Sequence, residues 1–155
     1  MTVFARRTCL FLAAAAFALS GCGRGETGSI NDLNNRTVTL PDGTKIRAEL
    51  VTKEVDLMRG LMYRESLAEN AGMLFAYGKP GFYRFWMHEV KFRIDILWLD
   101  RERRIVQIVH NLPPCPGPAE SCPVYGGDFS SLYVLELNSG MAKKHNLKPG
   151  MVIDF

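Results

Sequence analysis

Short apolar runs separated by polar turns dominate the chain from residue 37 onward. Runs of this kind, rich in β-branched, leucine and aromatic residues, predict β-strands. Pro-Asp-Gly at 41–43, Gly-Lys-Pro-Gly at 78–81 and Asp-Arg-Glu-Arg at 100–103 have the composition of tight turns between them. The predicted strands are residues 37–40, 44–52, 72–77, 82–90, 94–99, 104–109, 131–137 and 151–155.

Helical spacing of apolar residues occurs in only two places. One predicted helix covers 53–59 and ends at Gly60, and the other begins after Ser139 and ends near Asn146. Strands joined by hairpin turns, with few helices, favour the α+β class. We therefore expect a mostly antiparallel β-sheet curled into a small barrel or sandwich, with one or two short helices packed on it.

The first residues follow a different pattern. Arg6 and Arg7 precede an apolar run at 9–19, which ends in Leu19-Ser20-Gly21-Cys22. The run is about half of the roughly 20 residues that a membrane-spanning helix needs, so it is typical of a secretory signal. The ending resembles the bacterial lipobox, which implies that Cys22 becomes the lipidated first residue of the mature protein. An ordinary signal peptide and a single anchoring helix are the alternatives.

These patterns divide the chain into three segments: a lipoprotein signal peptide at 1–21, a lipidated flexible tether at 22–35, and a single globular β-rich domain at 36–155. The lipid at Cys22 would attach the domain to a membrane of the cell envelope. Gly23, rather than an aspartate, follows the cysteine. By resemblance to other lipoproteins, this predicts the outer membrane, facing the periplasm, in a cell with two membranes.

Charge and motifs narrow the possible functions. Loss of Arg6 and Arg7 with the signal lowers the formal net charge from +3 to +1, so no nucleic-acid partner is expected. The sequence lacks zinc-type Cys and His spacing, a Gly-rich phosphate loop and a Gly-x-Ser-x-Gly motif. We therefore predict no metal and no cofactor. The residues do not indicate an oligomeric state.

Cys115 and Cys122 lie in the proline-rich segment 113–123. Its prolines are incompatible with a helix or a central strand, so the segment is a predicted loop. In an oxidising compartment, the two cysteines are expected to form a disulfide that closes this loop. A redox-active pair is the alternative, although six intervening residues differ from the Cys-x-x-Cys spacing of redox motifs.

Several strings between residues 38 and 155 together carry a family resemblance. They are Arg59-Gly60-Leu61-Met62, Gly72-Met73-Leu74-Phe75, Phe85-Trp86-Met87, Ile94-Asp95-Ile96, Pro113-Pro114-Cys115, Val134-Leu135-Glu136-Leu137 and Leu147-Lys148-Pro149-Gly150. In this order they resemble the domain-of-unknown-function family numbered 192. The resemblance implies a small β-rich domain found in many bacterial and archaeal envelopes, with no established reaction. Where that family commonly reads Trp-Met-Lys-Asn-Thr, this chain reads Trp86-Met87-His88-Glu89-Val90.

Asp95 and Glu136 each interrupt an otherwise apolar strand. A buried carboxylate must be hydrogen-bonded, paired or protonated, because burying it bare is very unfavourable. If the two converge, they could act as the catalytic acid–base pair of a small glycoside hydrolase, which is our alternative function. We favour a structural role, in which each accepts backbone N–H bonds or pairs with an arginine. The candidate partners are Arg59, Arg84 and Arg93.

Aromatic residues crowd positions 82–98, beside polar and basic ones. Aromatic faces next to polar groups suit envelope glycans or peptides, so Tyr83, Trp86, His88 and Asp95 form a predicted ligand-binding surface. The alternatives are core packing of the aromatic rings and a structural role for His88. The sequence as a whole predicts a membrane-anchored envelope lipoprotein that binds or supports other molecules rather than catalysing a reaction.

Overall fold

Residues 34–155 are described by the computed structural model, and most of their apolar runs belong to one six-stranded sheet. Its strands are β1 (Asn35–Thr39), β2 (Lys45–Val51), β3 (Ala71–Gly81), β5 (Ile94–Leu99), β6 (Ile105–Leu112) and β8 (Ser131–Asn138). Their order across the sheet is β1-β2-β3-β8-β5-β6, so β8 is central. The predicted signal peptide and the tether up to residue 33, with Cys22, lie outside the described residues.

The α+β class is confirmed, and the sheet is mostly antiparallel. The single parallel pair is β2 with β3. Its connection passes through α1 (Glu54–Arg59) and a long loop, because a parallel pair cannot be joined by a tight turn. The strands do not close into a barrel: β1 and β6 are the two edge strands and do not pair with each other, and the arrangement is sandwich-like.

Two predicted strands are shorter than expected. Within 82–90 only β4 (Phe85–Trp86) is a strand, paired with β7 (Val124–Tyr125) in a separate two-stranded ribbon. The chain turns after Trp86 and Glu89 has a positive φ of 56°, which ends the alternation of a strand. At 151–155 the backbone makes only isolated bridges, to Thr39 and Arg104.

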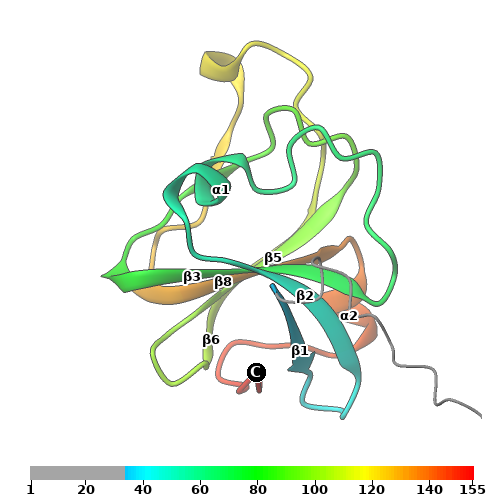
Figure 1. Cartoon of the computed structure of the whole chain (residues 1–155), viewed down its shortest axis with the longest axis vertical. Helices are drawn as coiled ribbons and strands as arrows, with labels where there is room; N and C mark the ends of the chain where they lie inside the picture. The colour runs from blue at the N-terminus through cyan, green and yellow to red at the C-terminus, as the bar shows by residue number, and fades with distance from the viewer. Residues whose placement is uncertain (1–33) are drawn as a thin grey trace, which may run out of the picture.

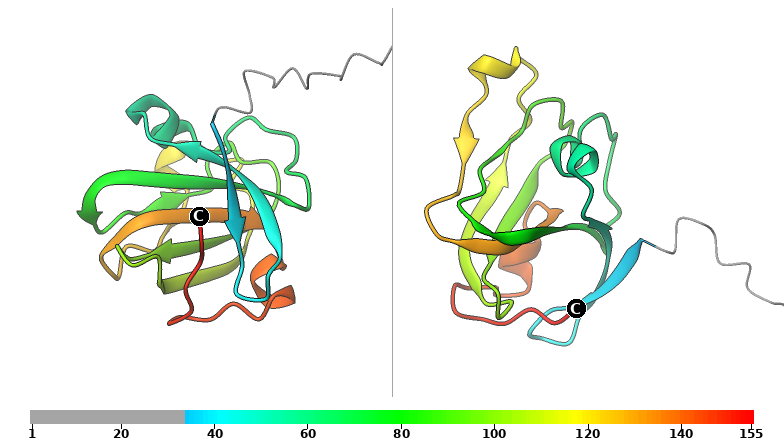
Figure 2. Two further views of the ribbon diagram at one scale, coloured as in Figure 1. Left: turned by 60° about the horizontal axis from the view of Figure 1, so that its bottom comes forward. Right: turned by 60° about the vertical axis from the view of Figure 1, so that its left-hand side comes forward.

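Each face of the sheet carries its own apolar cluster. One cluster contains Leu97, Leu135 and Leu137 and is covered by α2 (Met141–Lys144) and the C-terminal residues. The other contains Phe75 and Trp98 and is covered by the segments around α1 and β4. Figures 1 and 2 show α1 and the proline-rich loop on one side of the sheet, with α2 and the C-terminus on the other.

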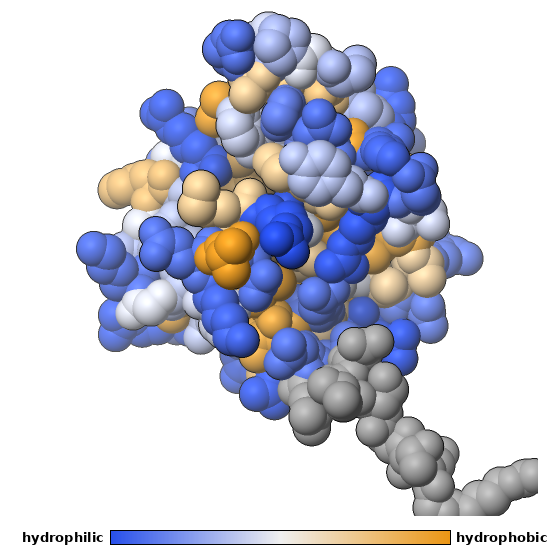
Figure 3. Space-filling view, turned by 45° about the horizontal axis from the view of Figure 1, so that its top comes forward, coloured by the Kyte–Doolittle hydropathy of each residue, from blue (hydrophilic) through white to orange (hydrophobic). Residues whose placement is uncertain are grey.

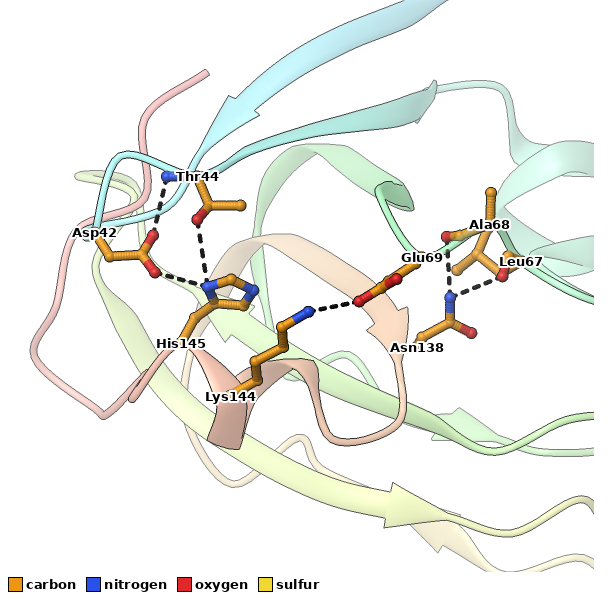
Figure 4. Close-up of polar contacts among 8 residues, drawn as sticks. All are labelled: Asp42, Thr44, Leu67, Ala68, Glu69, Asn138, Lys144 and His145. Carbon is orange, nitrogen blue, oxygen red and sulfur yellow. Dashed lines mark hydrogen bonds and ion pairs between the residues drawn. The ribbon is translucent and has the colours of Figure 1, made fainter.

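Polar contacts fasten α2 to neighbouring segments (Figure 4). Nδ1 of His145, directly after α2, lies 2.6 Å from Oδ2 of Asp42 in the β1–β2 turn, and Lys144 pairs with Glu69. Asn138 donates hydrogen bonds of 2.8 and 3.0 Å to the carbonyls of residues 67 and 68. Specific contacts therefore hold α2 and the strand before it against segments that are distant in the sequence.

The proline-rich segment contains the expected disulfide. Cys115 and Cys122 are bonded, with their Cα atoms 5.8 Å apart. Apart from the short 3₁₀ helix η2 (Ala119–Ser121), the segment is irregular, as its prolines predict. A backbone bridge between Cys115 and His88 brings this loop beside the residues that follow β4.

Candidate functional site

A pocket of about 380 Å³ opens between α1 and β4, on the Phe75 side of the sheet. This volume is at the lower end of the roughly 300–1,000 Å³ typical of small-molecule sites. Residues of α1 and the turn after it form one wall, and residues 84–86 form another. The part nearest the sheet is contributed by Phe75, Tyr77 and Glu136. The pocket therefore combines three segments that are far apart in the sequence.

Glu136 is the buried acid of this pocket. It lies in the central strand β8, is 4% exposed, and its Oε2 has no hydrogen-bond partner. Burial raises its pKa to about 8, and the charge of Arg64 opposes this only in part. Arg64 is itself paired with Glu49 at 2.6 Å. At neutral pH the Glu136 carboxyl is therefore protonated and carries an O–H group that can donate.

Gly60 forms the part of the pocket wall that approaches this acid. It ends α1, with its N–H donating to the Asp56 carbonyl at 2.9 Å, and has φ 49° and ψ −129°, a conformation that suits glycine. A β carbon here would lie 3.2 Å from Cζ of Phe75 and 4.0 Å from Oε2 of Glu136. The missing side chain thus lets the backbone lie against the Phe75 ring and close to the acid.

Aromatic rings stiffen the other walls. Phe85 contacts Phe75 edge-on, with ring centroids 5.0 Å apart, and contacts Trp98 in the same way at 5.8 Å. Trp98 is fully buried and its Nε1 donates to the Tyr83 carbonyl at 2.8 Å, which fixes the chain just before β4. Tyr77 stacks on Tyr83 with centroids 3.5 Å apart, and burial raises the pKa of Tyr77, so its phenol stays neutral. Such a framework holds the pocket open without a ligand.

The mouth of the pocket combines apolar and charged side chains. Met58 and Trp86 are 74% and 40% exposed there. Arg59 and Arg84 also line the pocket, and the guanidinium group of neither makes a hydrogen bond or ion pair with the residues that the structure describes. Glu54 is the one exposed carboxylate among the lining residues. Figure 3, which views the molecule with this side turned forward, shows apolar and strongly hydrophilic side chains close together.

The structure separates the predicted ligand-binding residues. Trp86 lines the pocket, and His88 lies next to it, with ring centroids 5.3 Å apart. Tyr83 is half-buried behind the pocket, and its hydroxyl donates to the Lys79 carbonyl at 2.6 Å. Trp86 and His88 are thus neighbours on one surface. Their role in binding, and that of Tyr83, stays a prediction.

Asp95 does not belong to that surface, which corrects the prediction. It is fully buried, and its two carboxylate oxygens accept hydrogen bonds from the N–H groups of Asn111, at 2.8 Å, and Ala142, at 2.9 Å. These bonds hold the first turn of α2 and a left-handed residue of β6. The structural role that we favoured from the sequence, acceptance of backbone N–H bonds, describes Asp95.

The paired-carboxylate hydrolase is ruled out by strand register. In the β5–β8 ladder Ile96 lies opposite Glu136, and Asp95 lies opposite Leu137. Residues that face each other across a ladder share a side of the sheet, and successive residues alternate. Asp95 and Glu136 therefore point to opposite sides, and no single cleft contains both. The predicted arginine pairing is also absent, since neither carboxyl pairs with Arg59, Arg84 or Arg93 among the described residues.

Gly60 and Tyr77 were not predicted as parts of a site. The available signal for Gly60 was a glycine directly after a predicted helix, and Tyr77 looked like any aromatic strand residue. Within residues 34–155, no group of three or more His, Cys, Asp or Glu side chains is arranged to hold a metal ion. In the same range, no helix is long and apolar enough to cross a membrane.

Comparisons with known proteins place the domain in a family. A solved protein of unknown function from Novosphingobium aromaticivorans DSM 12444 is similar, with a TM-score of 0.68 and 30% identity over 77% of this chain and 82% of the other. A protein from Sinorhizobium meliloti 1021, named as a candidate transcription regulator, has a TM-score of 0.66 and 26% identity over 76% and 89%. No curated protein matches the chain. The model of DUF192, a family described as Uncharacterized ACR, matches residues 37–155, and the chain belongs to this family.

Proposed function

We propose that this protein is a non-catalytic envelope lipoprotein whose domain binds a small molecule in the pocket beside Glu136. One observation carries the proposal: a buried carboxyl with an unpartnered oxygen lies at the inner end of an aromatic-lined pocket. Buried polar groups in folded proteins nearly always have a hydrogen-bond partner. A ligand with a suitable polar atom would supply that partner.

The energetics favour this interpretation. An unsatisfied buried polar group costs about 1–3 kcal/mol of folding free energy, and a ligand that pairs with Glu136 would recover part of this cost. Leu57, Met58 and Phe85 offer apolar surface around the same cavity, so burial of an apolar ligand adds to its affinity. The site therefore suits a ligand that is mostly apolar and has at least one polar group.

Non-catalytic binding fits the chemistry of the lining residues. Hydrolysis of a glycoside needs two carboxyl groups facing one substrate, and Asp95 points away from Glu136. The other lining carboxylate, Glu54, is exposed on α1 at the mouth. The proposal includes attachment through a lipid on Cys22, which would restrict ligands to those of the envelope, on the periplasmic side of the outer membrane where a cell has two membranes. An envelope glycan or peptide on Trp86 and His88 is the second candidate, supported by the exposure of Trp86.

The test is a small-molecule fragment screen on the mature lipidated protein in lipid nanodiscs, read by thermal stability and tryptophan fluorescence. Met58→Trp narrows the mouth of the pocket, whereas Val55→Trp places the same ring on an exposed position of α1 that does not line it. We expect fragments to bind the wild type and Val55→Trp but to bind Met58→Trp weakly. Equal binding to all three proteins, or no binding fragment at all, would contradict the proposal.

Two further readouts separate the remaining possibilities. Mass spectrometry should recover the bound fragments unchanged, and a converted product would contradict the non-catalytic role. Binding of envelope glycans and peptides is measured for the wild type, Trp86→Ala and Met58→Trp. Binding of these that depends on Trp86 but not on Met58 would favour the second candidate over the pocket.

A further inference from the structure

We propose that the ligand of this pocket is an organic acid, with an apolar or aromatic body and one carboxylate held by Glu136 and by the guanidinium groups of Arg59 and Arg84. This inference rests on the proposed small-molecule binding and adds the chemical class of the ligand. Three observations carry it: two guanidinium groups without partners among residues 34–155, the buried unpartnered carboxyl, and the apolar lining.

Unpaired arginines give the pocket a preference for anions. The guanidinium groups of Arg59 and Arg84 have no hydrogen-bond or ion-pair partner among residues 34–155, and Glu54 is the only exposed acid that lines the pocket with them. Guanidinium groups stay charged at any physiological pH and bind carboxylates through two parallel hydrogen bonds. A carboxylate that enters the mouth therefore gains the ionic partner that both arginines lack.

Packing holds the stem of Arg84 in a defined place. Gly127 has a φ of 79°, and a β carbon there would lie 2.7 Å from Cγ of Arg84. The glycine thus leaves room for the arginine stem to pack against the backbone near residue 127. A stem that is already packed loses less conformational entropy when its guanidinium binds a ligand.

Glu136 selects an acid over an amine. In its protonated form the carboxyl donates an O–H to a ligand carboxylate, which is a strong charge-assisted hydrogen bond. Burial raises its pKa to about 8, so this form dominates at neutral pH. An amine would gain no ion pair from the neutral carboxyl and would have to pass two guanidinium groups at the mouth. A neutral amide could accept the hydrogen bond but would gain nothing from the arginine charges.

The pH test needs a range in which Glu136 is the side chain near the pocket that changes its charge. Arg64, after α1, is paired with Glu49, and Tyr77 on β3 has a pKa raised by burial. Arginine keeps its charge throughout the range, and Glu54 is exposed at the mouth. The side chains of β5 in this apolar cluster are not ionisable. His88 lies beyond Trp86 and does not line the pocket. Affinity changes between about pH 7.5 and 9.5 therefore report on Glu136.

A matched set of three probes isolates the polar group: 4-phenylbutanoate, 4-phenylbutanamide and 4-phenylbutylamine share one apolar body. Calorimetric titration into the mature lipidated protein at pH 7 should give the acid at least about tenfold tighter binding than the amide or the amine. Arg84→Gln and Arg59→Gln should each weaken binding of the acid several-fold and leave the amide unchanged. Lys53→Gln removes the same charge from a neighbouring residue that does not line the pocket, and should have no effect.

The pH profile tests Glu136 itself. For the wild type, affinity for the acid should fall by about tenfold per pH unit above the Glu136 pKa, because ionised Glu136 repels the ligand. Glu136→Gln keeps a donor of the same shape at every pH, so this variant should bind the acid with a flat profile between about pH 7.5 and 9.5. A flat wild-type profile would overturn the inference, as would a variant that keeps the wild-type slope.

The outcomes also separate this inference from the proposed function. If the amide or amine binds as tightly as the acid, and Met58→Trp weakens that binding, the organic-acid inference fails while the pocket stands. If the fragment screen finds pocket ligands but none of the three probes binds, the organic-acid inference also fails and the pocket stands. If the acid binds equally well to Met58→Trp, the pocket itself is wrong and both proposals fail.

Discussion

Gly60 and Glu136 lie next to each other in the lining of the pocket: a β carbon on the glycine would be 4.0 Å from Oε2 of the acid. The glycine ends α1 on one side, and the acid belongs to the central strand β8 on the other. The carboxyl is 4% exposed. Its burial raises the pKa of the acid, and Gly60 is one of the residues packed beside it.

Substitution of Gly60 by alanine should destabilise the domain. The new β carbon would meet Phe75 at 3.2 Å, and the residue would have to keep a positive φ. Backbone strain of this kind costs about 1–3 kcal/mol, measurable by urea unfolding of the full chain. Gly78→Ala is the control, because nothing lies within 4 Å of its β carbon and its φ lies outside the left-handed range. Equal unfolding free energies for the two variants would contradict this account of Gly60.

The Glu136 carboxyl should make stability depend on pH. Its pKa is about 8 in the folded protein and 4.5 for an ordinary glutamate, so between these values only the unfolded chain releases the proton. Raising the pH through this window therefore favours unfolding, by up to about 1.4 kcal/mol per pH unit. Glu136→Gln cannot titrate, so its unfolding free energy should rise relative to the wild type from about pH 5 to 8 and level off outside that window. A constant difference across this window would show that the carboxyl is not buried in its neutral form.

Asp95 should affect stability without affecting the pocket. Asp95→Ala removes the acceptor of two backbone N–H groups, one of them the start of α2. Hydrogen bonds to a charged group are each worth about 1.5–3 kcal/mol, so the loss should reach about 3 kcal/mol or more. Asp95→Asn keeps one acceptor oxygen and should lose less. Ligand binding measured on folded Asp95→Asn should equal that of the wild type, and a clear loss of affinity would return Asp95 to the site.

The sequence predicted correctly those turns and strands that are determined by residues close to them in the chain. The Pro-Asp-Gly turn at 41–43 does join β1 to β2, and the apolar runs of β5 and β8 are fully or largely buried strands. The truncation of β4 depends on distant residues instead. The Met87 carbonyl accepts from Cys115 and the Glu89 carbonyl accepts from Tyr63, which together hold this segment out of a regular strand. No local pattern contains that information.

The two carboxylates show the same limit in the site. Asp95 and Glu136 look alike in the sequence, each a single acid in an apolar strand. Register places them on opposite faces, and the faces differ in what covers them. On the face covered by α2, this helix supplies an N–H group to Asp95. On the face covered by α1, Gly60 lies beside the pocket that contains Glu136. Which acid accepts backbone hydrogen bonds and which keeps an unpartnered oxygen is therefore decided by tertiary packing.

The disulfide should stabilise the domain independently of the pocket. Cys115 and Cys122 close a short loop, which in the chain-entropy model contributes about 2 kcal/mol, with some reduction because prolines already stiffen the unfolded chain. The double variant Cys115→Ser with Cys122→Ser should therefore unfold at lower urea concentration, with unchanged affinity for pocket ligands. Thiol titration of the unfolded, unreduced wild type should find no free thiol at these positions, and two after reduction. Two free thiols before reduction would show that the bond does not form in the purified protein, and the stability difference should then vanish.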